Sequence, residues 1–103
     1  MPNANLASAL SAHAIPGCLD FEASPLGGPV ARLTHGDCQA LVALHGAQVL
    51  NWTHGGDGLL WLSPVARIRD GKGIRGGIPI CWPWFADHPT DASQPAHGFV
   101  RHR

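Results

Sequence analysis

The residues with the clearest chemical potential lie near the end of the chain, in a segment rich in glycine, proline and tryptophan. Residues 73–85 read GIRGGIPICWPWF. Arg75 precedes two glycines that allow another group to approach the backbone closely, and its guanidinium fork matches a carboxylate or a phosphate. By itself this motif is equally typical of an anion-binding site and of an arginine in a surface ion pair.

A second candidate motif, HGFVR, occupies residues 97–101. The imidazole of His97 can donate a proton, or hydrogen-bond a hydroxyl group, near neutral pH. In an extended segment, His97, Phe99 and Arg101 would point to one face, with the phenyl ring as an apolar floor. An isolated histidine is more often structural, so both interpretations stay open at this point.

Two tryptophans, Trp82 and Trp84, lie between these motifs. Their ring faces suit stacking against the C–H groups of a sugar, and we expect at least one of them to belong to the core. The nearby His88, His97 and His102 form no H-x-H or H-E-x-x-H pattern, and few carboxylates surround them. We therefore expect no metal site among them.

Short strands joined by glycine-rich turns are expected upstream of these motifs. The pattern predicts strands at residues 30–35, 40–44, 48–54 and 59–63, with turns at residues 36–37 and 55–58. The apolar run at 40–44 is typical of a strand buried on both faces, and Gly46 marks a bulge or a close approach of backbone. A helix at residues 39–44 is the weaker alternative. Turns about ten residues apart predict an antiparallel sandwich or barrel.

The region after Ser63 is predicted to be irregular. Arg67 and Arg69 are interleaved with an acidic residue and glycines and are expected in a solvated loop. From residue 73 onward, recurring prolines exclude a helix or a central strand. The large apolar side chains there are too many for a free surface loop, so we expect a loop packed onto the core.

The composition limits the classes of partner. Of the 103 residues, 45% are hydrophobic and only 14% charged, whereas an average protein has about 25% charged residues. A formal net charge of +0 argues against nucleic acid as a partner, and no apolar run approaches the ~18 residues of a membrane span. The three cysteines lack a C-x-x-C pattern and are typical of reduced thiols in the cytoplasm.

The segment GKGIRGGIPICWPWFADHPTDASQPAHGFVR closely resembles the hexose-6-phosphate mutarotases, or glucose-6-phosphate 1-epimerases, of the aldose 1-epimerase superfamily. The upstream LHGAQVLNWTHGGDGLLWLSPVA is similar to the opening strands of the same family, and the resemblance covers about Val30 to Arg103. It implies an all-β fold of the galactose-mutarotase supersandwich type. Residues 29–103 would be the N-terminal portion of this large antiparallel β-sandwich, here truncated, and residues 1–28 a lead-in segment.

The resemblance also implies a reaction, the interconversion of the α and β anomers of a hexose 6-phosphate. One group removes the proton of the C1 hydroxyl while another protonates the ring oxygen, without a metal or an organic cofactor. Arg75 and Arg101 match arginines that contact the sugar phosphate, and His97 matches a histidine that orients the substrate. Trp82 and Trp84 are expected to bind the sugar. Many relatives have Gln and Gly where this chain has Ala96 and Ala86.

Members of that family are well over twice as long as this chain, and their general-acid histidine and general-base glutamate lie downstream of the matching region. We therefore expect an N-terminal fragment that is inactive alone and that is unstable or aggregates. Two other functions fit the same residues. One is a non-catalytic module that binds a sugar phosphate. The other is a protein-interaction module with the apolar segment PICWPWF as its contact surface.

Overall fold

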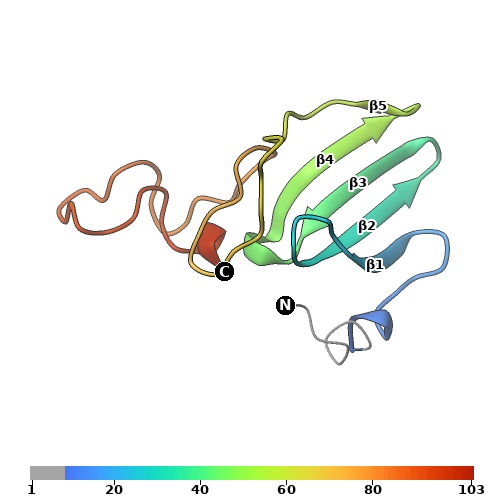
Figure 1. The fold of residues 1–103 in the computed structure, drawn as a ribbon, viewed down its shortest axis with the longest axis horizontal. Helices are drawn as coiled ribbons and strands as arrows, with labels where there is room; N and C mark the ends of the chain where they lie inside the picture. Colours follow the sequence, from blue (N-terminus) through green and yellow to red (C-terminus); the bar gives the residue numbers. More distant parts are fainter. Residues whose placement is uncertain (1–8) are drawn as a thin grey trace.

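The computed structural model describes residues 9–103 as one antiparallel sheet followed by a long irregular segment (Figure 1). Strands that are neighbours in the sheet are neighbours in the sequence: β1 (Leu19–Ala23), β2 (Pro29–His35), β3 (Cys38–Ala43), β4 (Gln48–His54) and β5 (Asp57–Gly58). Two short 3-10 helices are η1 (His45–Ala47) and η2 (Val100–His102). This all-β architecture is the predicted one. Within the same range, no helix is long and apolar enough to cross a membrane.

The three central strands form close to where the sequence predicts them, with β3 beginning and ending slightly earlier than expected. The turn between β2 and β3 has Gly36 at φ 57°, and His35 lies directly opposite Cys38 in the register. The register of β3 against β4 shifts between Leu41 and Val42, so β4 carries an extra residue. That residue is Leu50, which is fully buried, and the bulge therefore directs a large side chain into the core.

Gly46 marks a close approach of backbone, as predicted. It lies in η1 at φ 70° and is buried. A Cβ atom at this position would lie 2.9 Å from the Cα atom of Arg101, which comes from the last turn of the chain. Only glycine allows the C-terminal η2 to pack this closely against η1.

The prediction of a strand at residues 59–63 is wrong. The sheet ends with the two residues of β5, and only Leu62 in this segment forms an isolated bridge, to Gly76. The backbone of Ser63 donates to the carbonyl of Arg75 at 3.0 Å, and that of Gly77 donates to the carbonyl of Trp61 at 2.7 Å. Leu59 still donates to the carbonyl of Trp52 in β4 at 2.8 Å, and the segment departs from the sheet after it, where its hydrogen bonds go to the irregular segment.

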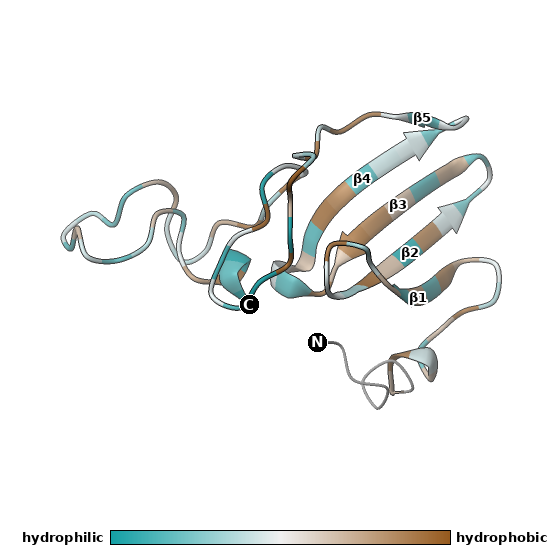
Figure 2. Ribbon diagram, in the orientation of Figure 1, coloured by the Kyte–Doolittle hydropathy of each residue, from teal (hydrophilic) through white to brown (hydrophobic). Residues whose placement is uncertain are grey.

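The prediction that residues 40–44 form a strand buried on both faces is also wrong. Of β3 only Ala43 is fully buried, because the irregular segment covers one face of the sheet and only one end of it. On the other face Leu33, Ala40 and Trp52 lie opposite one another on adjacent strands. Leu33 and Trp52 are 42% and 49% exposed. Figure 2 shows the hydrophobic stretches along β2, β3 and β4.

The core forms between β2, β3 and β4 and the irregular segment. Its buried members are Val30, Ala43, Leu50, Ala66 and Ile74. Gln48 is completely buried among them, and its Nε2 donates to the carbonyl of Ile74 at 2.9 Å and to that of Gly76. The irregular segment is thus attached to the sheet by a buried side-chain amide as well as by apolar contacts.

The later part of this segment departs from the prediction of a packed loop. Ile74 is buried, yet Ile80, Trp82 and Phe85 are 44%, 65% and 76% exposed. Figure 1 shows this part, drawn in orange and red, projecting from the sheet before the chain returns to η2. Only the beginning of the predicted loop therefore packs onto the core.

We expect Gly77→Ala to destabilise the protein strongly. A Cβ atom on Gly77, at φ 64°, would lie 2.0 Å from the carbonyl oxygen of Val49, an atom that already accepts a hydrogen bond from Ile78. Gly71→Ala is the matched control, because Gly71 has φ 73° and open space at the Cβ position. Urea unfolding of the intact protein should show a loss of roughly 1 kcal/mol for Gly71→Ala and of at least about 2 kcal/mol more for Gly77→Ala. Equal losses would contradict this packing.

The C-terminal η2 places His102 among positive charges. Partial burial, followed by the charges of Arg101, His45 and Lys72, lowers the pKa of His102 below its ordinary value of 6.5. The folded state thus binds the proton less tightly than the unfolded state does. The contribution of His102 to stability is complete above the unfolded-state pKa and is lost as the pH falls through the folded-state pKa.

The thermal midpoint of the intact protein should therefore decrease as the pH is lowered from about 7.5 to about 5.5, a range that spans the ordinary histidine pKa. In His102→Gln this fall should be smaller, since the uncharged amide does not titrate. His13→Gln, at an exposed position outside η2, serves as the control and should keep the parental pH dependence. A His102→Gln variant with an unchanged pH dependence would show that this side chain does not set it.

Candidate functional site

Arg75 has a fixed backbone and an exposed side chain. The bridge between Leu62 and Gly76 and the hydrogen bond to Ser63 hold its main chain beside the sheet. In the part of the chain that the structure describes, the ion pairs are Arg32 with Glu22 and His54 with Asp37, so Arg75 pairs with no carboxylate. Of the two interpretations open for this motif, the surface ion pair is therefore not the one that forms.

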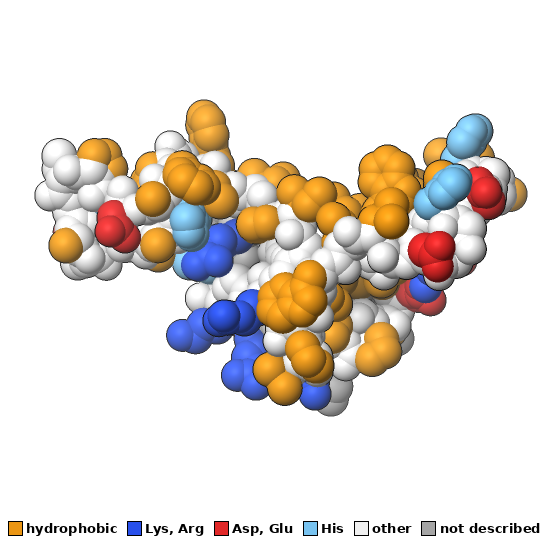
Figure 3. Space-filling model, turned by 90° about the horizontal axis from the view of Figure 1, so that it is seen from above, with side chains coloured by type: hydrophobic (Ala, Val, Ile, Leu, Met, Phe, Trp, Pro, Cys, Tyr) orange, Lys and Arg blue, Asp and Glu red, His pale blue; other side chains and the backbone are white. Residues whose placement is uncertain are grey.

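A shallow cleft of about 420 Å³ opens beside Arg75. Half of its lining residues are cations, namely Arg67, Arg69, Lys72 and Arg75, and none is acidic. Figure 3 shows Lys and Arg side chains gathered in one region of the surface. Cations grouped around a concave surface create a local positive potential even in a chain of zero net charge.

Arg67 and Arg69 are exposed, as predicted for a solvated loop, yet they share this cleft with Arg75. Sequence reasoning treated them as separate from Arg75 and missed their convergence. A signal was present, because residues 67–75 hold four of the seven Lys and Arg residues of the chain and only one acidic residue, Asp70. The chain reverses direction within this run and brings its two ends to one cleft.

Arg101 does not lie on the extended segment that was expected for residues 97–101. His97 and Gly98 have φ values of 66° and 75°, and the chain then enters η2, so the two polar side chains do not alternate along a strand. The guanidinium of Arg101 instead lies against Gly73, where an added Cβ would meet Nη1 at 2.8 Å. Since Gly73 also lines the cleft beside Arg75, tertiary packing brings the two arginines into one neighbourhood.

The Nε atom of Arg101 is buried and has no hydrogen-bond partner among the described residues. A buried charged donor without an acceptor is costly, because it has lost its water without gaining a replacement. An anion that enters the cleft and reaches the guanidinium group would offset part of this cost.

His97 is held by a two-way contact with Ala86. The backbone amide of Ala86 donates to Nδ1 of His97 at 3.0 Å, and the amide of His97 donates to the carbonyl of Ala86 at 2.8 Å. Because Nδ1 accepts this hydrogen bond, the neutral ring carries its proton on Nε2, which is then the available donor. Ala86 adopts φ 60°, a conformation that favours glycine. No hydrogen bond or ring contact within residues 9–103 links His97 to Arg75 or Arg101.

The two tryptophans differ in their surroundings. Trp84 donates from Nε1 to the carbonyl of Pro95 at 2.9 Å, and its ring meets the edges of His88 and Phe99 at centroid distances of 4.6 and 4.8 Å. Trp82 is 65% exposed and is anchored through its carbonyl, which accepts from the amide of Phe99 at 2.7 Å. Trp84 therefore orders the projecting loop, whereas the ring of Trp82 is open to a ligand.

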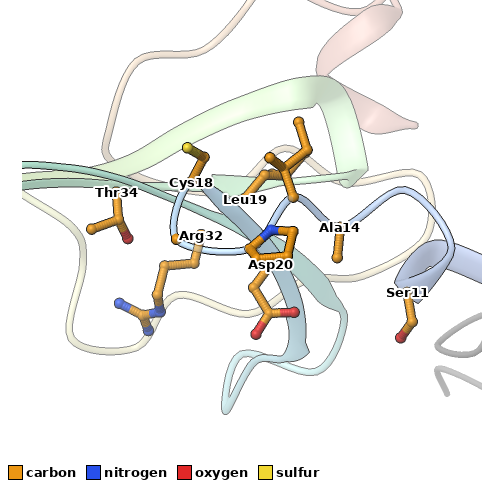
Figure 4. Close-up of a pocket in the computed structure, with 10 residues that line it drawn as sticks. Ser11, Ala14, Cys18, Leu19, Asp20, Arg32 and Thr34 are labelled. Atoms are coloured by element: carbon orange, nitrogen blue, oxygen red, sulfur yellow. The ribbon is translucent and has the colours of Figure 1, made fainter.

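A further groove of about 630 Å³ lies between the N-terminal turn and β1 (Figure 4). Asp20, Arg32 and Thr34 are among the residues that line it. The guanidinium of Arg32 already donates to Glu22 at 2.8 Å and to Gln39 at 2.9 Å. Because its one cation is already paired, this groove offers less to an anion than the cleft beside Arg75.

The chain is similar in sequence and in structure to several larger proteins. Over 68 residues the chain is 44% identical to a protein from Escherichia coli (strain K12) named "Putative glucose-6-phosphate 1-epimerase". The aligned region covers 65% of this chain and 23% of that protein. The crystal structure of a "putative mutarotase (YeaD)" from Salmonella typhimurium superposes with a TM-score of 0.72 at 35% identity, over 82% of this chain and 28% of that one. The crystal structure of HI1317 superposes with a TM-score of 0.70 at 38% identity, over 86% of this chain and 32% of that one.

The chain thus spans about a quarter of the length of the curated relative from Escherichia coli. Its sheet corresponds to part of a larger mutarotase structure, in agreement with the predicted portion of a β-sandwich. Residues 29–103 match the family model described as aldose 1-epimerase. This match includes β2 to β5, the cationic cleft and η2, and it shows that the chain belongs to the aldose 1-epimerase family.

Proposed function

We propose that this chain forms one wall of a hexose 6-phosphate site, in a protein that interconverts the α and β anomers of that sugar. The observation that carries the proposal is the cleft beside Arg75, in which four cations converge without a carboxylate. Membership of the family supports an isomerase that acts at C1 of a sugar. The cationic cleft supports a phosphorylated substrate.

A phosphate group is the ligand that this cleft suits best. It carries close to two negative charges and several strong acceptor oxygens, and an arginine can bind it through two parallel hydrogen bonds. Arg75 and Arg101 would bind the phosphate, since Arg75 lines the cleft and Arg101 lies against Gly73 of the same cleft. Neither arginine has an acidic partner among the described residues. The phosphate would thereby anchor the sugar ring with its C1 end away from the arginines.

The projecting loop would contact the sugar ring. Trp82 presents an exposed aromatic face, on which the C–H groups of a pyranose can stack. His97 would donate from Nε2 to a sugar hydroxyl or to the ring oxygen, in the tautomer that Ala86 selects. These groups bind and orient the substrate. Trp84 would act on the substrate through the loop that it orders.

The reaction itself requires two proton transfers. A base takes the proton of the C1 hydroxyl, an acid protonates the ring oxygen, and the C1–O5 bond breaks to give the open-chain aldehyde. Rotation about C1–C2 and ring closure on the other face then give the second anomer. We propose that the acid and the base lie in a part of the protein outside residues 1–103, so that this chain alone is inactive.

A second candidate function is a module that binds a sugar phosphate or a protein without catalysis. The exposed Ile80, Trp82 and Phe85 favour it, because apolar side chains gathered on a projecting loop are typical of a contact surface. Anomerisation of a sugar phosphate by the intact protein would exclude it as the whole function. Absence of binding to any sugar phosphate would favour the protein-interaction module instead.

The intact protein should accelerate anomerisation of glucose 6-phosphate far more than that of glucose. Arg75→Ala should lower kcat/KM for glucose 6-phosphate by roughly 10- to 100-fold, the equivalent of one hydrogen bond to a charged group. It should change the slow reaction of glucose little. Polarimetry with freshly dissolved α anomers measures both rates.

Arg32→Ala is the matched control, because it removes an arginine that is paired with Glu22 on the sheet rather than exposed in the cleft. It should leave both reactions near the parental level. An Arg75→Ala variant that keeps the parental preference for the phosphorylated sugar would show that Arg75 does not bind the phosphate. An intact protein without any preference for the phosphorylated sugar would refute the proposed substrate.

A further inference from the structure

A second cluster of chemically competent side chains lies at the other end of the strands, where the β2–β3 turn meets the end of β4. Asp37, Cys38 and His54 each offer one ligand atom there, and these three atoms lie within 4.8 Å of one another. The Oδ2 of Asp37 and the Nε2 of His54 are 3.6 Å apart. Histidine and acidic side chains can be seen together at one end of the molecule in Figure 3.

Backbone pairing brings these three residues together. Cys38 is the first residue of β3 and lies directly opposite His54, the last residue of β4. The amide of Gly55 donates to the carbonyl of Asp37 at 2.9 Å and ties the turn to the end of β4. The sheet therefore holds the three donors together in a relatively rigid frame, which lowers the entropy cost of binding an ion.

The donor set and its spacing suit a zinc ion. Zinc binds thiolate, imidazole and carboxylate ligands in a tetrahedron, with bonds of about 2.0–2.3 Å. Two ligands on such a tetrahedron lie roughly 3.3–3.6 Å apart, which matches the 3.6 Å between Asp37 and His54. We propose that Asp37, Cys38 and His54 form a binding site for zinc or a divalent metal of similar ligand preference.

The fourth position can be filled by water or by a neighbour. His35 lies opposite Cys38 on β2, and Asp57 lies opposite His54 on β5. Directly opposed residues in an antiparallel sheet project from the same face, with Cβ atoms about 5 Å apart. An imidazole and a carboxylate thus lie on the same face as Cys38 and His54, next to them in the register.

A simple ion pair explains the arrangement less well. The side chains of Asp37 and His54 are 73% and 64% exposed, and a pair this exposed contributes little to stability. An ion pair also leaves the thiol of Cys38 without a role, although this cysteine forms no disulfide. A metal would use all three groups and would join the β2–β3 turn to the end of β4.

Metal titration of the intact protein, after treatment with a chelator, tests the site. Zinc should bind with a stoichiometry of one ion per chain and raise the thermal midpoint, because the folded state holds the three donors together and binds the ion more tightly than the unfolded state does. Cobalt should give the near-ultraviolet absorption of a thiolate-to-metal charge transfer. Cys38→Ser, His54→Gln and Asp37→Asn should each weaken zinc binding by at least about tenfold. Even the mutation of a residue that contacts only the ligands lowers metal affinity by about 10- to 100-fold.

Cys81→Ser and His88→Gln are matched controls, because they remove a free cysteine and a histidine that lie in the projecting loop. Both should keep the parental affinity and, for cobalt, the charge-transfer absorption. Circular dichroism should show that every variant stays folded, as expected for residues at the surface end of the strands. Absence of zinc binding, or equal affinity in the three ligand variants and the parent, would overturn the proposal.

Discussion

The buried amide of Gln48 is the interaction on which the arrangement of the site depends. Its two N–H groups bind the carbonyls of Ile74 and Gly76, on either side of Arg75. Because these hydrogen bonds lie in the core, they cannot be exchanged for water without a large penalty. The chain is therefore fixed on both sides of Arg75, while the guanidinium remains exposed.

Glycines complete this arrangement by allowing backbone to pack directly on backbone. Gly77 lies against Val49, Gly46 against Arg101, and Gly73 beneath the guanidinium of Arg101. Each contact closes the distance between segments that are far apart in the sequence. As a result, the two ends of the sheet carry different chemistry, with four cations around a cleft at the Gln48 end and mixed metal-ligand donors at the His54 end. A net charge of +0 conceals this separation.

Local patterns predicted most of the sheet and less of the irregular segment. Alternation, a short apolar run and turn glycines located β2, β3 and β4, because side-chain pattern and turn conformation are local properties. They failed at residues 59–63, where the apolar pattern suits a strand but the backbones of Trp61 and Ser63 bond to residues 75–77. They failed again at residues 97–101, where positive φ values at His97 and Gly98 turn the chain. Both failures come from partners that lie elsewhere in the sequence.

The sequence by itself determined the fold class, the candidate residues Arg75, His97 and Arg101, and the resemblance to a sugar-phosphate isomerase, since these depend on residue type and local spacing. Only the tertiary structure decided which side chains meet. It placed Arg67 and Lys72 in the cleft of Arg75, brought Arg101 against Gly73, and gathered the donors around Cys38. Such contacts depend on strand register and on close packing between distant segments, which no local pattern encodes.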